Sequence, residues 1–294
     1  MTHRKLLGMI RDPTLWRSLA PNLAIEGSGQ GLVARTLEGS EMASLKCQLR
    51  KDGYFQIGEI FDPIEMARLE VGLGAITGAG WPAPFIFLFD EPWLVYARLD
   101  SLLRALLGPQ YRPLAAFFAW SLEKSGGASG WGPHRDHAVR TVGDSGDPDS
   151  ITLWVPITEA TPDNGCIHLL PASRDPNYWD QLEQCGSTTL QHVRALPARA
   201  GSVLGWSHQL LHWGGRATPS ARNRRMSLSA EFQRGEGLPL DMTLENRVPT
   251  FAERLALVGM QLIAYKHMQK PSAQLLDLAQ QLVEGTRYAS DPRI

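Results

Sequence analysis

From Leu114 to Phe232 the sequence consists of short apolar segments separated by Gly, Pro, Asp and Asn, which limits the fold to a few classes. Strands are predicted at the following segments, with one helix near 175–184: 115–123, 132–138, 150–157, 166–170, 202–206 and 224–233. Many short strands with turn residues between them favour a sandwich or a barrel. Asn164-Gly165 is interpreted as one of the turns.

Helical patterns lie on both sides of this region. On the N-terminal side, Asp12-Pro13 predicts a short helix, and a strand is expected from Tyr54. Asp62-Pro-Ile-Glu65 has the form of a capping box that opens a helix to about Leu73, and apolar residues repeat at helical spacing from Leu94 to Leu107. The segment Phe85-Ile-Phe-Leu-Phe89 is interpreted as buried packing.

Two further helical patterns close the chain, Thr250 to Met268 and Ala273 to Glu284. The expected fold is therefore mainly β with a helical envelope (α+β). We expect one domain over 1–294, with an N-terminal extension (1–48), a core (49–234) and a C-terminal helical segment (235–294). The apolar stretch Leu255 to Tyr265 suits packing on the core or on a second subunit, so the oligomeric state stays open.

Composition excludes several classes of function. A chain of 294 residues with 43% hydrophobic residues can bury a full core. A net charge of −1 argues against nucleic acid or an anionic membrane as partner. The three cysteines form no even disulfide framework, and we find neither a signal peptide nor an apolar run long enough to span a membrane. A cytoplasmic protein is expected.

His134-Arg135-Asp136, followed 78 residues later by His212, is the main chemical signal of the chain. On a strand, residues i and i+2 point to the same face, so His134 and Asp136 would aim together. Two imidazoles and one carboxylate form the facial triad that holds non-haem Fe(II) and leaves positions open for oxygen chemistry. His208 is the alternative to His212 as third ligand.

Several ordered segments resemble the phytanoyl-CoA dioxygenase-like (PhyH-like) family of Fe(II)/2-oxoglutarate-dependent oxygenases. The resemblance runs from about Leu49 to Phe232. It rests on these segments: Asp52-Gly53-Tyr54, Gly132-Pro-His134-Arg-Asp136, Trp154 to Ser173 with Asn164-Gly165 inside it, Gly201 to His212, and Arg225-Met-Ser227. The resemblance implies a double-stranded β-helix, a jelly roll related to the cupins.

The resemblance also assigns roles to residues. His134, Asp136 and His212 are implied as the ligands of Fe(II), with 2-oxoglutarate as cosubstrate and O2 as oxidant. An arginine on the strand after the distal histidine binds the far carboxylate of 2-oxoglutarate, and Arg225, with Ser227 on the same strand face, matches the family's spacing.

Arg222 and Arg224 compete with Arg225 for this role, because the gap after His212 is about two residues longer than usual for the family. Trp154 is interpreted either as a residue that flanks the cosubstrate or as a plain core tryptophan. Arg135 and Arg140 either meet an anionic substrate or are exposed without such a role, and His168 is interpreted as a core histidine.

The implied reaction is hydroxylation of an unactivated C–H bond of a small organic metabolite, with release of succinate and CO2. Family members that halogenate have a small residue in place of the carboxylate, so Asp136 favours hydroxylation. Desaturation, epimerisation and ring formation stay open, as do an oxygen-independent cupin-like isomerase or hydrolase and a non-catalytic binding protein. The substrate would be selected by the segments outside the core: 78–95, 139–150 and the C-terminal helices.

Overall fold

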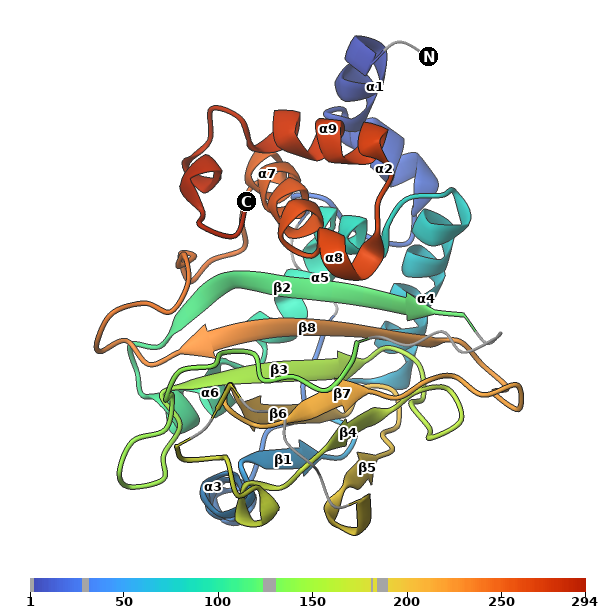
Figure 1. Ribbon diagram of the computed structural model, residues 1–294. Helices are drawn as coiled ribbons and strands as arrows, with labels where there is room; N and C mark the ends of the chain where they lie inside the picture. The colour runs from blue at the N-terminus through green and yellow to red at the C-terminus, as the bar shows by residue number, and fades with distance from the viewer. Residues whose placement is uncertain (1–2, 28–31, 124–130, 181, 184–189) are drawn as a thin grey trace.

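Two antiparallel sheets lie face to face in the computed structural model of the protein, which describes residues 3–27, 32–123, 131–180, 182–183 and 190–294. The five-stranded major sheet has the order β1-β6-β3-β8-β2, and the three-stranded minor sheet has the order β5-β4-β7 (Figure 1). The strands are β1 (Tyr54–Ile57), β2 (Arg112–Leu122), β3 (Ser150–Pro156), β4 (Ile167–Leu169), β5 (Arg194–Leu196), β6 (Val203–Ser207), β7 (His212–Gly214) and β8 (Arg225–Gln233). This arrangement is the jelly roll that the family resemblance implied.

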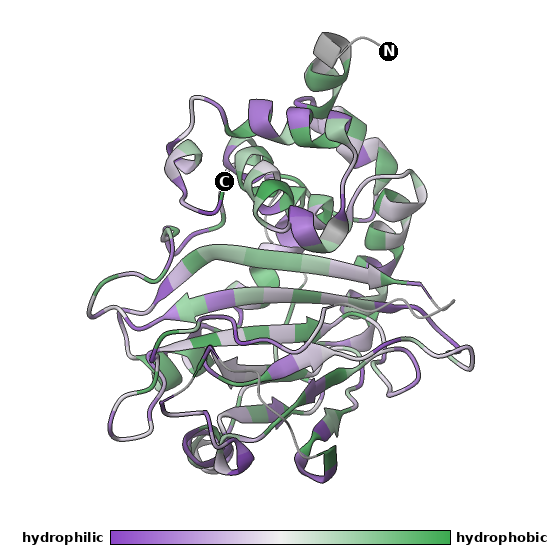
Figure 2. Ribbon diagram, viewed as in Figure 1, coloured by the Kyte–Doolittle hydropathy of each residue, from purple (hydrophilic) through white to green (hydrophobic). Residues whose placement is uncertain are grey.

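The helices cover the outer face and the β2 edge of the major sheet (Figure 1). They are α1 (His3–Ile10), α2 (Pro13–Leu19), α3 (Gly39–Asp52), α4 (Pro63–Gly78), α5 (Asp90–Ala97), α6 (Asp100–Leu107), α7 (Phe251–Ala264), α8 (Lys266–Gln269) and α9 (Ala273–Val283), with 3-10 turns η1 (Ala83–Leu88), η2 (Ala172–Arg174), η3 (Leu190–His192) and η4 (Arg287–Ser290). Figure 2 shows that α7, which packs on η1 and β2, is hydrophobic over most of its length. No helix in the described part of the chain is long and apolar enough to cross a membrane.

Strand alternation divides the interior into two regions. On β3, Ile151, Leu153 and Val155 point into the core under the helices, whereas Trp154 points into the space between the two sheets. All seven residues of β3 are buried, because this strand is covered on both faces. The residues of β8 alternate in the same way, and its odd-numbered side chains share the inner face with Trp154.

Most of the predicted elements are confirmed, with shifted boundaries. The helix expected over Leu94 to Leu107 is two helices, α5 and α6, and the strand from Tyr54 ends at Ile57. The 85–89 segment is fully buried, as predicted. Asn164-Gly165 is a turn in which the Asn164 side chain accepts a hydrogen bond from the Thr161 N–H (2.7 Å).

Two predicted elements are wrong. The segment 132–138 is a loop. Its only β-bridge lies at His134, which pairs with His212 in the three-residue strand β7. The helix expected near 175–184 is absent from the described residues 175–180, 182 and 183, which form turns after Asp175. Helix α3, by contrast, had no counterpart among the predictions.

Side-chain caps explain where several helices begin. Asp12 and Asp62 each accept a hydrogen bond from the backbone N–H two residues on, and proline is the first residue of both helices. The second half of the predicted capping box at Asp62 is wrong, since Glu65 pairs with Arg68 instead (2.8 Å). A complete capping box stands at the start of α7, between Thr250 and Glu253.

The capping box of α7 gives a stability prediction. We expect Thr250→Ala to lower the free energy of unfolding by about 1 kcal/mol, since the variant leaves an N–H of the first turn without its side-chain acceptor. Urea denaturation measures the difference. Thr36→Ala, at an exposed threonine outside the helices, serves as the control, and an equal effect of both substitutions would contradict the prediction.

Candidate functional site

Two chain segments bring the predicted triad together between the sheets. His134 and Asp136 lie on the loop before β3, and His212 is the first residue of β7. The backbones of His134 and His212 exchange two N–H···O=C hydrogen bonds, each of 3.0 Å. This bridge holds the two imidazoles next to each other, with ring centroids 4.4 Å apart and an angle of 48° between the ring planes.

Both triad histidines present the same nitrogen to the site. The Nδ1 of His134 lies 2.9 Å from the carbonyl of Gly132, and the Nδ1 of His212 lies 3.0 Å from the carbonyl of Leu210. A carbonyl only accepts, so each Nδ1 donates its proton and each Nε2 keeps a lone pair. The two Nε2 atoms lie 3.6 and 3.5 Å from the Oδ1 of Asp136.

The other oxygen of Asp136 is held by two donors. Its Oδ2 accepts hydrogen bonds from the Thr152 hydroxyl (2.6 Å) and the Trp206 indole N–H (2.9 Å). Burial opposes ionisation, but the adjacent imidazoles, His212 foremost, bring the pKa of Asp136 well below its ordinary value. The carboxylate is thus ionised, and Oδ1 is directed at both histidines.

These three side chains fit a divalent metal ion. Their donor atoms are two imidazole nitrogens and one carboxylate oxygen, and each of the three side chains is oriented by an outer hydrogen bond, as is usual for metal sites. Burial lowers the pKa of His212 to about 4, which keeps its ring neutral and able to bind a metal. The orienting partners Thr152 and Trp206 were not predicted, although strand alternation places both on the inner face.

Arg225 is a buried cation that forms no ion pair with any described residue. Its side chain is fully buried on β8, next to Ser227, and its guanidinium stands 5.8 Å from the centre of the Trp131 ring and 5.6 Å from that of Trp154. Among the described residues, its Nε and Nη2 have no hydrogen-bond partner. Burial lowers the pKa of Arg225 to about 10. A buried guanidinium of this kind suits an anionic ligand, and a carboxylate matches its geometry.

The competing arginines lie elsewhere. Arg222 is exposed, and Arg224 forms a 3.4 Å ion pair with the exposed Glu123. Of the three arginines, Arg225 alone is turned into the space between the sheets. The residue matched to the family's spacing is therefore the one available to a buried carboxylate.

Tryptophans line the space around Arg225. Trp154 is fully buried and belongs to the core between the sheets, a position that is compatible with either of its two predicted roles. Trp131 is stacked at an angle on Trp120 (4.7 Å between ring centres) and meets the rings of both His134 and His212 edge-on. Trp131 was not predicted, because it stands on a loop without a periodic pattern.

The remaining predicted residues have other partners. His208 is not part of the triad, since it lies with His137 and Glu231 in a second cluster. His168 is partly buried, with its Nδ1 3.1 Å from the carbonyl of Cys166. The role of Arg135 toward an anionic substrate is contradicted, because its side chain is buried in a 2.8 Å ion pair with Asp175.

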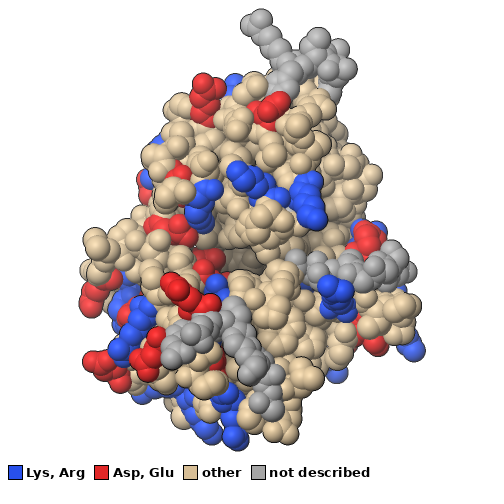
Figure 3. Space-filling view, viewed as in Figure 1, with Lys and Arg blue, Asp and Glu red and all other residues tan. Residues whose placement is uncertain are grey.

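The face turned toward the viewer in Figure 3 is hollowed near its centre, in front of the middle of the major sheet. Acidic side chains lie at the edge of the hollow, and basic side chains lie above it. A concave opening flanked by both charges suits a polar small molecule better than a chain of one charge such as a nucleic acid.

Residues 83–226 match the family model described as phytanoyl-CoA dioxygenase (PhyH). The chain belongs to the PhyH-like family. It is accordingly an enzyme of the oxygenase type that depends on Fe(II) and 2-oxoglutarate, with O2 as the oxidant. The matched region contains the whole triad and Arg225. No curated protein matches the PhyH-like chain.

Solved structures share the fold of the PhyH-like protein. AviO1 from Streptomyces viridochromogenes Tue57 is 21% identical, with 70% of this chain and 99% of that chain covered and a TM-score of 0.52. The non-haem α-ketoglutarate-dependent carbocyclase SnoK from nogalamycin biosynthesis is 14% identical (74% and 96% covered, TM-score 0.52). EctD from S. alaskensis with bound Fe is 18% identical (72% and 87% covered, TM-score 0.50). At these identities the likeness shows the jelly roll alone.

The burial of Arg225 leads to a binding prediction. Charged hydrogen bonds contribute about 1.5–3 kcal/mol, so we expect Arg225→Ala to weaken 2-oxoglutarate binding roughly tenfold or more. Calorimetric titration of the metal-loaded protein measures the dissociation constant. Arg222→Ala is the matched control and should bind normally. Loss of binding in Arg222→Ala but not in Arg225→Ala would refute the assignment.

The buried pair of Arg135 and Asp175 gives a second prediction. Removing one partner of a buried ion pair costs about 3–5 kcal/mol, because the other charge is left buried alone. We expect Asp175→Ala to lower the free energy of unfolding by this amount. Arg140→Ala should change it by less than about 1 kcal/mol, since its partner Asp144 is 99% exposed. Chemical denaturation distinguishes the two variants. If Asp175→Ala has as small an effect as Arg140→Ala, the Arg135–Asp175 pair does not stabilise the loop that carries His134 and Asp136.

Proposed function

We propose that this PhyH-like enzyme hydroxylates an unactivated C–H bond of a small organic metabolite. The overall reaction consumes the substrate, O2 and 2-oxoglutarate and yields the alcohol, succinate and CO2. One oxygen atom enters the alcohol and the other enters succinate. Bound Fe(II), together with O2 and 2-oxoglutarate, would supply the oxidant for the C–H bond.

The observation that carries this proposal is the orientation of Asp136. Its Oδ1 points at the Nε2 atoms of His134 and His212, while Thr152 and Trp206 hold its Oδ2. We assign these three side chains as the ligands of Fe(II), because they supply two nitrogens and one oxygen on one side of an ion. A carboxylate here occupies the position that would have to be open for a halide, which favours transfer of a hydroxyl group.

Arg225 and Ser227 are assigned to the far carboxylate of 2-oxoglutarate. The guanidinium offers its unpartnered Nε and Nη2, and the Ser227 hydroxyl lies on the same strand face, 3.5 Å from Nη1. Trp154 would flank the cosubstrate, since its ring stands over the same guanidinium. The burial of Arg225 and Ser227 excludes water from this end of the site, which strengthens the ion pair and protects the oxidant.

An anaerobic absorbance titration tests the proposal. Metal-free protein receives Fe(II) and then 2-oxoglutarate, and we expect a visible charge-transfer band that needs both additions. In Asp136→Ala the band and all substrate turnover should be lost, because one of three metal ligands is missing. Succinate release under O2 then serves as the readout of a substrate screen, with product mass distinguishing hydroxylation from desaturation, epimerisation or ring formation.

Two outcomes would overturn this assignment. A protein that binds the metal tightly but forms no band with 2-oxoglutarate would be an oxygen-independent metalloenzyme. Unchanged turnover in Asp136→Ala would remove Asp136 from the metal site. Asp144→Ala, at a fully exposed carboxylate of the following loop, is the matched control and should retain the band.

A further inference from the structure

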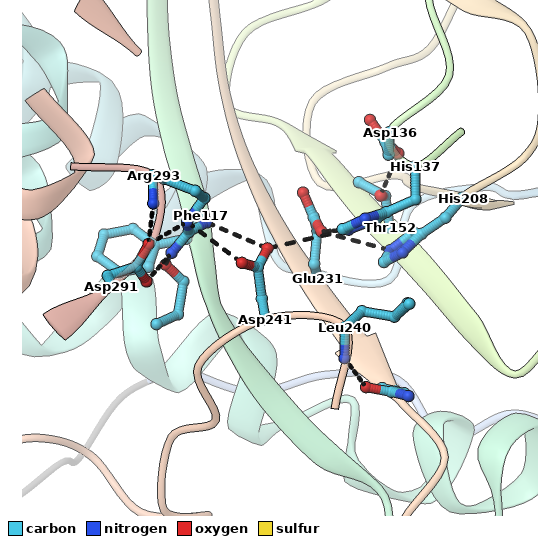
Figure 4. A network of polar contacts seen from close by, with 12 residues as sticks. Phe117, Asp136, His137, Thr152, His208, Glu231, Leu240, Asp241, Asp291 and Arg293 are labelled. Atoms are coloured by element: carbon cyan, nitrogen blue, oxygen red, sulfur yellow. Dashed lines mark hydrogen bonds and ion pairs between the residues drawn. The ribbon is translucent and has the colours of Figure 1, made fainter. Parts of the chain in front are cut away.

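A second group of two histidines and one carboxylate lies next to the triad. The Nε2 atoms of His137 and His208 stand 3.5 and 3.6 Å from the Oε2 of Glu231. The triad shows the same two separations, 3.6 and 3.5 Å, between its imidazoles and its carboxylate. Figure 4 shows both rings of the second group directed at Glu231.

These separations suit ligands of one ion better than hydrogen bonds. A nitrogen and an oxygen that share a proton lie within about 3.2 Å of each other. Two ligand atoms about 2.0–2.1 Å from a tetrahedral zinc ion lie roughly 3.4 Å apart. The Nε2 atoms of His137 and His208 therefore stand at ligand distance from Glu231 rather than at hydrogen-bond distance.

The same two chain segments supply the histidines of both groups. The backbones of His134 and His212 form the bridge of the triad. Further along the same pair of segments, the His137 N–H donates to the carbonyl of His208 (3.2 Å). The rings of His137 and His208 are stacked, with centres 4.9 Å apart and an angle of 24° between them. The pairing that builds the triad thus also holds the second group.

The second group is buried and not satisfied by the protein. His208 is fully buried, and within the described chain neither of its ring nitrogens makes a hydrogen bond of normal geometry, although the Ile151 carbonyl faces the ring. The Oε2 of Glu231 also has no hydrogen-bond partner among the described residues. Burial lowers the pKa of His208 to about 3, so its ring is neutral. Buried polar atoms without partners are rare and indicate a missing ligand.

The charge around the group favours a dication. Arg293 pairs with Asp241 (3.3 Å) and with Asp291 (2.8 Å), and Asp241 lies 3.9 Å from the Nε2 of His137 (Figure 4). With Glu231, three carboxyl groups and one guanidinium stand around the two imidazoles. Asp241 is engaged by Arg293, so it would act from outside the ligand set.

We propose that His137, His208 and Glu231 form a second metal site, for a divalent transition ion such as Zn2+, separate from the iron triad. The ligand set is two imidazole nitrogens and one carboxylate oxygen, a combination that zinc accepts in proteins. Three protein ligands leave a fourth position for water or for an oxygen of the substrate. Through its three ligands, the ion links the loop that carries His134, Asp136 and His137 to β8 and to the turn after β6.

Metal stoichiometry tests this site independently of catalysis. Chelator-treated full-length protein is equilibrated with Zn2+, desalted and measured by mass spectrometry for zinc per chain. We expect two ions in the wild type, one in Glu231→Gln or His208→Gln, one in Asp136→Ala and none in the double variant Asp136→Ala/Glu231→Gln. Loss of outer-shell partners alone weakens metal binding about 10–100-fold, so loss of a ligand should exceed that.

Controls separate this site from the triad and from surface histidines. Glu231→Gln should keep the band formed with Fe(II) and 2-oxoglutarate, and His192→Ala, in neither group, should keep two ions. If the Glu231 and His208 variants fail to fold, Co2+ replaces Zn2+ in Asp136→Ala, where one ion with tetrahedral visible absorption is expected. One ion in the wild type, two ions in Glu231→Gln, or no Co2+ absorption in Asp136→Ala would overturn the proposal.

Discussion

The backbone bridge between His134 and His212 is the contact on which the site depends. Two hydrogen bonds of 3.0 Å join a loop to a strand of three residues and bring two histidines that are 78 positions apart in the sequence to one site. Neither segment is a long strand that would hold its register alone. The loop is therefore anchored a second time, by Arg135, whose buried ion pair with Asp175 fixes the residue between His134 and Asp136.

The inner face of the major sheet supplies the remaining chemistry by simple alternation. Arg225, Ser227 and Glu231 lie on the same side of β8, and β3 sets Thr152 directly opposite Glu231. At one end of β8 this face thus carries the buried cation of Arg225, and at the other end it carries the carboxylate of Glu231 among histidines. The cation and the carboxylate lie at different ends of one interior. The jelly roll therefore has room for an anionic cosubstrate and for metal ions side by side.

Prediction from sequence worked where the signal was local. Asp62-Pro63 marked the start of α4, and short apolar segments between turn residues marked β3 and β8 within a few residues. Prediction failed where long-range contacts decide. The segment 132–138 was predicted to be a strand, yet only His134 forms a β-bridge there, with His212. The expected helix near 175–184 is replaced over its described residues by turns that follow Asp175, whose side chain pairs with the distant Arg135.

The sequence by itself indicated a sandwich or barrel and the group of His134, Asp136 and His212, because these follow from turn residues, residue type and spacing. The jelly roll and the match of Arg225 to the cosubstrate position came from the resemblance to the PhyH-like family. Only the tertiary structure distinguished Arg225 from Arg222 and Arg224, since burial depends on which strand face is covered. It also joined His137, His208 and Glu231, which are far apart in sequence and carry no common motif. Their proximity results from strand pairing, and no local pattern records which strands pair.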